Sequence, residues 1–321
     1  MRMEVSLKLV AAAAIAALTL TSTMARVDAF GDAGHRVIGR IAELRLRDTR
    51  ALAEIRRILK QRETLADAAV WPDVIKNPLY EDEDTALFRL NHPAHDTYHY
   101  ANLPFQSPRY DLAVLGARPS DIVQTAREAI RVLRGTSRFF TRREALRVLA
   151  HLTGDVHQPL HTGNAFLTAS APLQFIVPDG ATGWRSTLGG NALVYGPANR
   201  FNLHSYWDSH AVNLSMGQDD VEGYAARLFK QVPVVPGWRS EGDAESWPAQ
   251  WASESLALAR DAHKGISLLE YIGPDDQNRT PHRWTIRQPA GYDDLAKSRV
   301  PAQLAAAGYR LAATLQAIWP N

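Results

Sequence analysis

Apolar residues recur at helical spacing through most of the chain, whereas strand-like alternation is rare. Between Ser120 and Gly135 they lie three or four positions apart, which predicts an amphipathic helix with Ser120 as its N-cap. Thr141 and Glu144 have the spacing of a capping box, in which each residue's side chain accepts from the other's backbone N–H. This pair predicts the start of a second helix, over 141–157.

The C-terminal region shows a further apolar helical face, with Pro301 in its predicted first turn. Only two segments, 173–177 and 191–195, have the composition of strands. No internal repeat and no low-complexity linker divides the chain. The pattern therefore predicts a mainly α fold, in a single helical domain with a small β-hairpin region.

The N-terminal residues follow a different pattern. Arg2 and Lys8 precede an apolar run of twelve residues, 9–20, and small residues follow it as far as Ala29. This order is typical of a secretory signal peptide over 1–29. A membrane anchor is the alternative, but the run is shorter than the ~20 residues that a spanning helix needs.

Cleavage after Ala25 satisfies the small-residue rule as well as cleavage after Ala29 does. With either cut we expect export, to a secreted or periplasmic location, and no stable association with a membrane. The predicted mature domain covers 30–321.

The composition limits the chemistry available to this domain. The formal charge of the 321 residues is +2, and it falls to +1 without 1–29, which hold three basic and two acidic residues. A protein that grips duplex nucleic acid through its phosphates usually has a larger basic excess. The chain has no cysteine, which excludes disulfides and thiolate metal sites. A metal would need imidazole and carboxylate ligands, which suit zinc better than manganese or iron.

Five short segments hold most of the His and Asp residues that could carry chemistry. They are GDAGH (31–35), WPDVIK (71–76), YHYAN (98–102), HLTGDVHQPLH (151–161) and NLHSYWD (202–208). His151 and Asp155 lie one helical turn apart, and Pro159 is expected to end their helix and free His161 to reach a neighbouring centre. The fifth segment repeats the His-x-x-x-Asp spacing. One such pair is typical of a surface ion pair, but two pairs with a histidine after a proline favour a metal centre.

The remaining histidines receive other assignments. His157 lies away from the face of His151 and Asp155, and it is expected to hydrogen-bond a ligand residue rather than a metal. The others are expected to be surface or structural residues: His92, His95, His210, His263 and His282.

Taken in order, the motifs GxxGH, W-x-D-x-I-K, HYxN, H-x-x-x-D-x-H-Q-P-L-H, GGN and N-L-H-x-x-W-D resemble the zinc-dependent single-strand-specific nuclease and 3′-nucleotidase family. That family belongs to the phospholipase C/nuclease superfamily of helical trinuclear-zinc phosphoesterases. The resemblance runs from Phe30 to the C-terminal helix, and the longest motif is its most specific part. It implies an exported endonuclease that hydrolyses single-stranded DNA and RNA to 5′-phosphorylated products by a metal-activated water, with 3′-nucleotidase activity.

The resemblance also implies three zinc ions per chain. Their implied ligands are Asp73, His99, His151 and Asp155 for one ion; His161, His204 and Asp208 for another; and His35, a bridging Asp155 and the amine and carbonyl of Phe30 for the third. An amine at Phe30 is free only after cleavage behind Ala29. The resemblance therefore favours that cut over the one behind Ala25.

Further roles follow from the same resemblance. Asp73 is expected to orient or deprotonate the attacking water, and Lys76 to offset charge on the phosphate. Tyr100 and Asn102 stand where the family recognises a base, although Tyr100 could equally be a core residue. The segment 162–188 is longer than in most relatives and is expected to affect substrate range. The expected partners are single-stranded DNA and RNA and 3′-nucleotides, bound by a monomer.

Two other functions remain possible from the residues. One is a phospholipase C on the same metal scaffold, against which Asp208, in place of Glu, and the HYxN motif favour the nuclease. The other is a non-catalytic zinc-binding or storage protein. Lys76 beside Asp73 argues against storage, because storage needs no cation to bind a phosphate.

Overall fold

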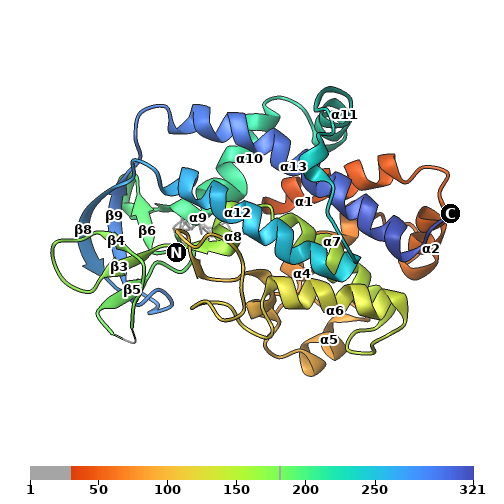
Figure 1. The fold of residues 1–321 in the computed structure, drawn as a ribbon, viewed down its shortest axis with the longest axis horizontal. Coiled ribbons are helices and arrows are strands. Elements are labelled where there is room, and N and C mark those ends of the chain that lie inside the picture. The colour runs from red at the N-terminus through yellow and green to blue at the C-terminus, as the bar shows by residue number, and fades with distance from the viewer. Residues whose placement is uncertain (1–29, 181) are drawn as a thin grey trace, which may run out of the picture.

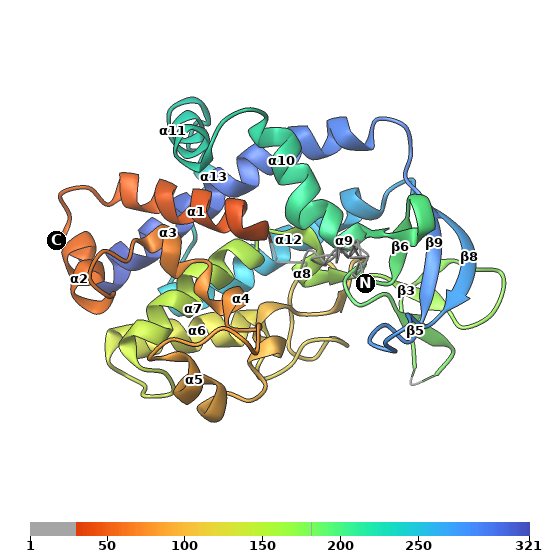
Figure 2. The ribbon, with the colours of Figure 1, turned by 180° about the vertical axis from the view of Figure 1, so that it is seen from behind.

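The computed structural model describes residues 30–180 and 182–321. The predicted signal peptide, 1–29, lies outside the described residues. Helices make up most of the described fold, and the labelled strands gather at one end, opposite the C-terminus and α2 (Arg50–Ile58) (Figures 1 and 2). The prediction of a mainly α fold with a small β region is confirmed.

The other α-helices are α1 (Gly31–Arg45), α3 (Leu65–Ala68), α4 (Trp71–Val74), α5 (Thr85–Asn91), α6 (Ile122–Arg134), α7 (Arg142–Asp155), α8 (Pro159–Thr162), α9 (Leu203–Ser205), α10 (Ala211–Met216), α11 (Val221–Gln231), α12 (Trp247–His263) and α13 (Tyr292–Ile318). Short helices of other types are η1 (His95–His99), η2 (Pro197–Asn199), η3 (Tyr206–His210), η4 (Pro236–Trp238) and η5 (Ala244–Ser246).

The central helix is α7, which packs against α1, α3, α4, α6 and α13. Every residue from Glu144 to Asp155 is buried, so this helix has no solvent-facing side over that stretch. The predicted capping box is confirmed: Thr141 Oγ1 accepts from the Glu144 N–H at 3.2 Å, and Glu144 Oε2 accepts from the Thr141 N–H at 2.7 Å. A helix buried on all sides cannot carry a surface ion pair, which removes the simpler explanation for the His and Asp at its end.

The first and last helices, α1 and α13, cross closely beside α7 (Figure 1). At the contact a Cβ on Gly308 would lie 2.6 Å from Ile41 Cβ, closer than side-chain atoms approach. Glycine is therefore needed at position 308 for the two backbones to come this near. The contact holds α1 in place and with it the residues near the start of the domain.

Across 30–180 and 182–321, the strands form three small sheets. They are β1 (Leu103–Pro104) with β2 (Gly163–Asn164); β4 (Phe175–Ile176), β3 (Phe166–Thr168) and β5 (Trp184–Ser186) in that order; and β7 (Phe201–Asn202), β6 (Leu193–Tyr195), β9 (Arg283–Arg287) and β8 (Ser267–Gly273) in that order. The predicted strands at 173–177 and 191–195 appear as β4 and β6. The β8–β9 pair was not predicted, although RWTIR alternates polar and apolar residues with Trp284 and Ile286 buried.

Two details of the predicted helices are wrong. Asp121, not Ser120, caps α6, because its Oδ1 accepts from the N–H groups of Val123 and Gln124 at 3.0 and 3.1 Å. Pro301 lies in the interior of α13 rather than in its first turn. Proline cannot donate the helical hydrogen bond there, so the packing of α13 against α1, α7 and α10 outweighs the local cost. Within the described residues, no helix has the length and apolar character that crossing a bilayer demands.

Candidate metal centre

Three groups of buried His and Asp side chains come together beside α7, and in each the ligand atoms lie within 4.8 Å of one another. The groups are His35, His151 and Asp155; Asp73, His99 and His151; and His161, His204 and Asp208. Every side chain with ligand character that the sequence predicted is present in them. The short motifs, far apart in the chain, therefore meet at one place.

Asp155, the last residue of α7, faces two of these groups at once. Its Oδ1 lies 3.2 Å from His35 Nε2, and its Oδ2 lies 3.0 Å from both His99 Nδ1 and His151 Nε2. The rings of His35 and His151 stack with their centroids 4.0 Å apart. One carboxylate with an oxygen toward each group has the geometry of a bridge between two cations.

Backbone carbonyls orient three of the histidines. The Nδ1–H groups of His151, His161 and His204 donate to the carbonyl oxygens of Ala69 (2.7 Å), His99 (2.6 Å) and Gly189 (2.8 Å) respectively. With the proton held at Nδ1, the lone pair of Nε2 is directed into the group. This arrangement is common around metal-binding histidines, because it sets both tautomer and ring direction.

The third group depends on two breaks in the helices. After α7 ends, Pro159 starts α8 and turns His161 toward Asp208, with His161 Nε2 3.7 Å from Asp208 Oδ1. The π-helical turn η3 carries Asp208, whose Oδ2 lies 3.3 Å from His204 Nε2. Gln158 Nε2 donates to Asp208 Oδ1 at 2.5 Å and holds that carboxylate. The predicted effect of Pro159 is confirmed, and π turns often occur at functional sites.

The start of α1 explains the two glycines of the GDAGH motif. Phe30 caps the helix with φ of 40° and is buried, and its carbonyl accepts from the Gly34 N–H at 3.0 Å. A Cβ on Gly34 would lie 2.8 Å from Phe30 Cβ, and one on Gly31 would lie 3.1 Å from Ser209 Oγ beside Asp208. Close packing thus sets Gly31 against η3 and Gly34 against Phe30, at the start of the helix that carries His35.

Several atoms of the centre have no hydrogen-bond partner among the described residues. These buried atoms are both nitrogens of His35, Asp73 Oδ2, Asp155 Oδ1, His161 Nε2 and Asp208 Oδ2. Burial of an unpaired polar atom costs about 1–3 kcal/mol, so such a concentration is unusual in a stable fold. Cations bound between these nitrogen and oxygen atoms would satisfy them, and the residues present therefore fit a metal site.

The ionisation of the centre also suits metal binding. Burial acts to raise the pKa of Asp155, but His151 and His161 lower it well below its ordinary value. Burial and then the Lys76 ammonium lower the pKa of His99 to about 3. Burial acts to lower the pKa of His161, but the carboxylates of Asp155 and Asp208 outweigh it and raise this pKa to about 9. A cation held by the third group would therefore take the place of the second proton of His161, at Nε2.

Asp73 and Lys76 form a pair at the edge of the centre. Lys76 Nζ donates to Asp73 Oδ1 at 2.6 Å, and the lysine side chain is 27% exposed whereas that of Asp73 is buried. Burial acts to raise the pKa of Asp73, but Lys76, His151 and His99 lower it below its ordinary value. An ionised Asp73 carboxylate can bind a cation and accept a hydrogen bond, and the Lys76 side chain that pairs with it is partly exposed.

Tyr100 and Asn102 lie next to the centre. Between them, the Ala101 N–H donates to the carbonyl of His161 at 2.7 Å, and β1 then pairs with β2 just after α8. Both side chains are half-buried, and neither has a hydrogen-bond partner in the described parts of the chain. Tyr100 is therefore not a core residue, which was the alternative left open by the sequence.

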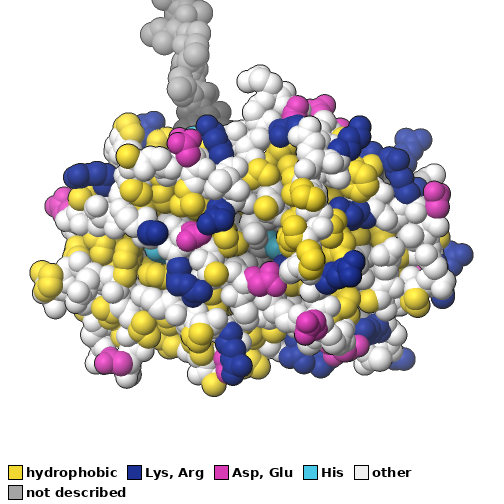
Figure 3. Space-filling view, turned by 45° about the horizontal axis from the view of Figure 1, so that its top comes forward, with side chains coloured by type: hydrophobic (Ala, Val, Ile, Leu, Met, Phe, Trp, Pro, Cys, Tyr) yellow, Lys and Arg dark blue, Asp and Glu magenta, His cyan; other side chains and the backbone are white. Residues whose placement is uncertain are grey.

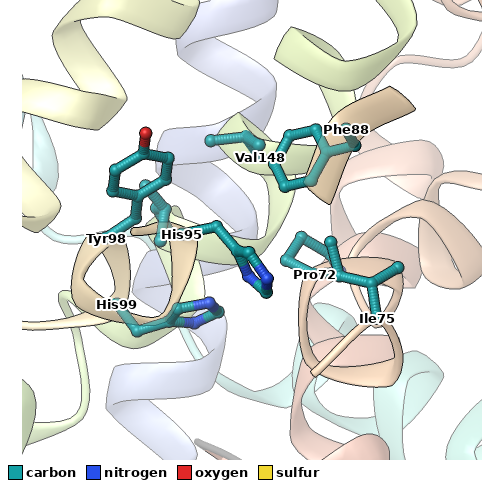
Figure 4. Close-up of a pocket in the computed structure, with 8 residues that line it drawn as sticks. Pro72, Ile75, Phe88, His95, Tyr98, His99 and Val148 are labelled. Carbon is teal, nitrogen blue, oxygen red and sulfur yellow. The ribbon is translucent and has the colours of Figure 1, made fainter. Parts of the chain in front are cut away.

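Other predicted residues pack around the ligands. The predicted role of His157 is wrong: its Nδ1–H donates to the Thr153 carbonyl and its Nε2 accepts from Arg310, so it braces α7 against α13 instead of holding a ligand. Sequence spacing could not show that the far side of α7 faces a buried arginine. His95 lines a cavity of about 10 Å³ beside His99 and Pro72 (Figure 4). That volume holds one water molecule at most, so this cavity is too small for a ligand.

The surface has no large field of one sign on the face drawn in Figure 3, where Lys and Arg side chains are interspersed with Asp and Glu. Side chains of both signs are thus interspersed on this face and do not form separate patches. This face therefore offers a polyanion no broad basic surface.

Comparison with known proteins agrees with this architecture. The family model described as S1/P1 Nuclease matches residues 30–320. Endonuclease 2 of Arabidopsis thaliana is 25% identical over 309 residues, which cover 91% of each chain. Endonuclease 5 of the same plant is 26% identical over 330 residues and 95% of each chain, and Endonuclease 3 is 26% identical over 327 residues.

The helical fold, the three His–Asp groups and these matches define a metal-dependent nuclease that acts on the phosphodiester bonds of nucleic acids. The chain belongs to the S1/P1 nuclease family. This result favours the nuclease over the phospholipase C that the motifs alone left open.

Proposed function

We propose that the protein is an exported, zinc-dependent endonuclease that cuts single-stranded DNA and RNA to 5′-phosphorylated products and also has 3′-nucleotidase activity. The observation that carries the proposal is the position of Asp155, whose carboxylate faces two of the three His–Asp groups. The chain belongs to the S1/P1 nuclease family, which supports the same interpretation. Curated relatives of similar length are named endonucleases, which supports internal cleavage.

Three zinc ions are proposed, because the ligand atoms are imidazole nitrogens and carboxylate oxygens without thiolate. Asp73, His99, His151 and Asp155 would hold one ion, and His161, His204 and Asp208 another. His35 and Asp155 would hold the third together with the amine and carbonyl of Phe30. Bound zinc would supply Lewis acidity for water and for phosphate oxygens.

The chain's own residues have separate tasks. The ionised Asp73 carboxylate would orient the attacking water by accepting its hydrogen bond. The ammonium of Lys76, whose side chain is partly exposed, would contact a phosphate oxygen and offset charge that builds up there. Both groups lie on or just after α4, so one short helix sets their separation.

Tyr100 and Asn102 are proposed to bind the base beside the cleaved phosphate. A ring that stacks on an unpaired base contributes ~1–3 kcal/mol, and this contact is closed to a base inside a duplex. The side-chain amide of Asn102 is available to a base edge. These two contacts would give a preference for single strands and allow the enzyme to accept 3′-nucleotides.

We propose export through the signal peptide 1–29, to a secreted or periplasmic location, and a monomeric mature enzyme. The supporting argument is chemical. The amine of Phe30 can bind a cation only when the peptide bond to Ala29 is cut, and Phe30 starts the helix that carries His35.

The test uses purified protein that begins at Phe30, with single-stranded DNA, RNA, 3′-AMP and phosphatidylcholine as substrates and elemental analysis for metals. Cleavage of the first three substrates with three zinc ions per chain is expected. Asp155→Asn should abolish the activity, whereas Asp261→Asn, a matched change in a surface ion pair with Arg299, should not. Hydrolysis of phosphatidylcholine alone, or full activity with no metal bound, would contradict the proposal.

A further inference from the structure

A cluster of polar and aromatic side chains lies where the two larger sheets meet, outside the metal centre. We call Arg185 of β5, Tyr271 of β8 and His282 just before β9 the sheet-junction cluster. The Arg185 guanidinium carbon lies 5.5 Å from the centroid of the Tyr271 ring, and Arg185 Nη1 lies 2.6 Å from His282 Nδ1. The Tyr271 hydroxyl contacts the same imidazole at 2.9 Å.

The cluster is open to solvent on one side and anchored on the other. Tyr271 is 44% exposed, whereas Trp284, which stands opposite it in the β8–β9 ladder, is 1% exposed. The rings of Tyr271 and Trp284 lie 5.7 Å apart. A buried tryptophan thus supports an exposed ring, which favours a preformed surface over a mobile one.

Arg185 brings a positive charge that no carboxylate neutralises in the described parts of the chain, since its guanidinium contacts an imidazole and a phenol ring instead. Burial and then Arg185 itself lower the pKa of His282, so the imidazole stays neutral beside the guanidinium. An uncompensated planar cation next to an exposed ring matches two parts of a nucleotide, its phosphate and its base.

The cluster is tied to the metal centre by a short piece of chain. Arg185 precedes Gly189 by four residues, and the Gly189 carbonyl accepts from His204. Asn164, just after α8, fixes this piece by accepting from the Gly189 N–H at 2.8 Å. Four extended residues span at most about 13 Å, which is one or two nucleotides of a single strand. Both ribbon views place β5, β8 and β9 at one end of the molecule, with α9 between these strands and α8, which lies nearer the middle (Figures 1 and 2).

We propose that the sheet-junction cluster binds a nucleotide of a single-stranded polymer that flanks the one being cleaved, with Arg185 on its phosphate and Tyr271 or the guanidinium face against its base. This inference rests on the proposed function, and it assigns a role to part of the 162–188 segment. The cluster then discriminates polymers from mononucleotides, because a 3′-nucleotide in the metal centre has no flanking nucleotide for the cluster to bind.

The experiment measures binding apart from hydrolysis. A phosphorothioate single-stranded oligonucleotide carries the fluorophore, and anisotropy gives its Kd for the unmodified protein, Arg185→Ala and Arg57→Ala. Arg57 is a matched control, because its ion pair with Glu54 lies on α2 at the opposite end of the molecule. We expect Arg185→Ala to raise Kd roughly tenfold and to reduce the salt slope by about 0.7, as loss of one phosphate contact does in a single strand.

Steady-state rates then separate the outcomes. Arg185→Ala should raise KM for single-stranded DNA and leave kcat and KM for 3′-AMP within about twofold. Tyr271→Ala should act in the same direction. Arg185→Lys should keep the salt slope but bind the oligonucleotide more weakly, because lysine keeps the positive charge but lacks the planar guanidinium group.

An Arg185→Ala protein that binds the oligonucleotide like the unmodified one overturns the inference, and so does equal loss on the polymer and on 3′-AMP. A different result is also informative: Arg185→Ala weakens binding as expected, but the unmodified protein cleaves none of the substrates. That result would contradict the proposed function and still support the role of the cluster in binding. The two failures are therefore distinguishable.

Discussion

Gly154→Ala should separate the stability of the protein from its activity. Gly154 is a helical residue of α7, directly before Asp155, and replacement of glycine by alanine inside a helix ordinarily stabilises it by about 1 kcal/mol. Here, however, the new Cβ would lie 2.7 Å from His35 Nδ1 and 2.8 Å from His35 Cε1. The methyl group occupies space that the imidazole ring needs.

The displacement can be worked out from these distances. Ordinary contact begins at 3.4 Å, so the ring must retreat by roughly 0.7 Å if the helix stays in place. It cannot simply rotate away, because it is stacked on His151 at 4.0 Å. Metal–ligand distances tolerate changes of only about 0.2 Å, so a displaced His35 is lost as a ligand. A misplacement of this order costs roughly 100-fold in turnover.

The assay compares three proteins for metal content, thermal unfolding and kcat on single-stranded DNA. Gly154→Ala should bind one metal ion fewer than the unmodified protein, lose roughly 100-fold in kcat and, with the metals removed from both proteins by a chelator, keep a similar Tm. Gly223→Ala adds the same methyl group at an exposed position of α11, with Asp220 Oδ1 3.1 Å away, and should keep metal content and kcat. Full metal content and full turnover in Gly154→Ala would refute the packing argument for His35.

Three further predictions concern other parts of the molecule. Asp155→Asn should lower kcat more than Asp208→Asn, because the carboxylate of Asp155 faces two ligand groups and that of Asp208 faces one; comparable losses at equal metal content would count against the bridge. Burial lowers the pKa of His263 to about 4 from 6.5, so the unfolded chain takes up a proton there as pH falls below 6.5 while the folded protein does not until about pH 4. Over that window the unmodified protein should lose about 3 kcal/mol more unfolding free energy than His263→Phe loses. Denaturation of both proteins at pH 7 and at pH 4 measures the two losses, and equal losses would contradict this prediction. A protein with an uncleaved Met before Phe30 should bind one zinc fewer than correctly processed protein, because an amide nitrogen is a poor ligand; equal zinc content and turnover, with each N-terminus checked by mass, would show that the amine is not a ligand.

Local sequence carried the information about most helices and about the ligand side chains. The capping box at Thr141 and Glu144 depends on contacts three residues apart, and it formed as predicted. The pairing of His151 with Asp155 follows from one helical turn, and the turn at Pro159 follows from the absence of an N–H. These interactions are short in sequence, so spacing alone determines them.

Longer-range effects decided the rest. Pro301 entered the interior of α13 because packing against three helices outweighed a local preference that sequence patterns describe. His157 could not be assigned from its spacing, since its partner Arg310 is 153 residues away.

The residue types and spacings of the motifs, and the absence of cysteine, were determined by the sequence itself, and they were enough to indicate a metal centre of His and Asp. Only the tertiary structure decided that Asp155 turns one oxygen to each of two groups, that Gly154 leaves room for His35, and that Arg185 meets Tyr271 and His282. Each of these depends on side chains from separate elements meeting in one place. No local pattern encodes such a meeting, because it is set by the packing of the whole fold.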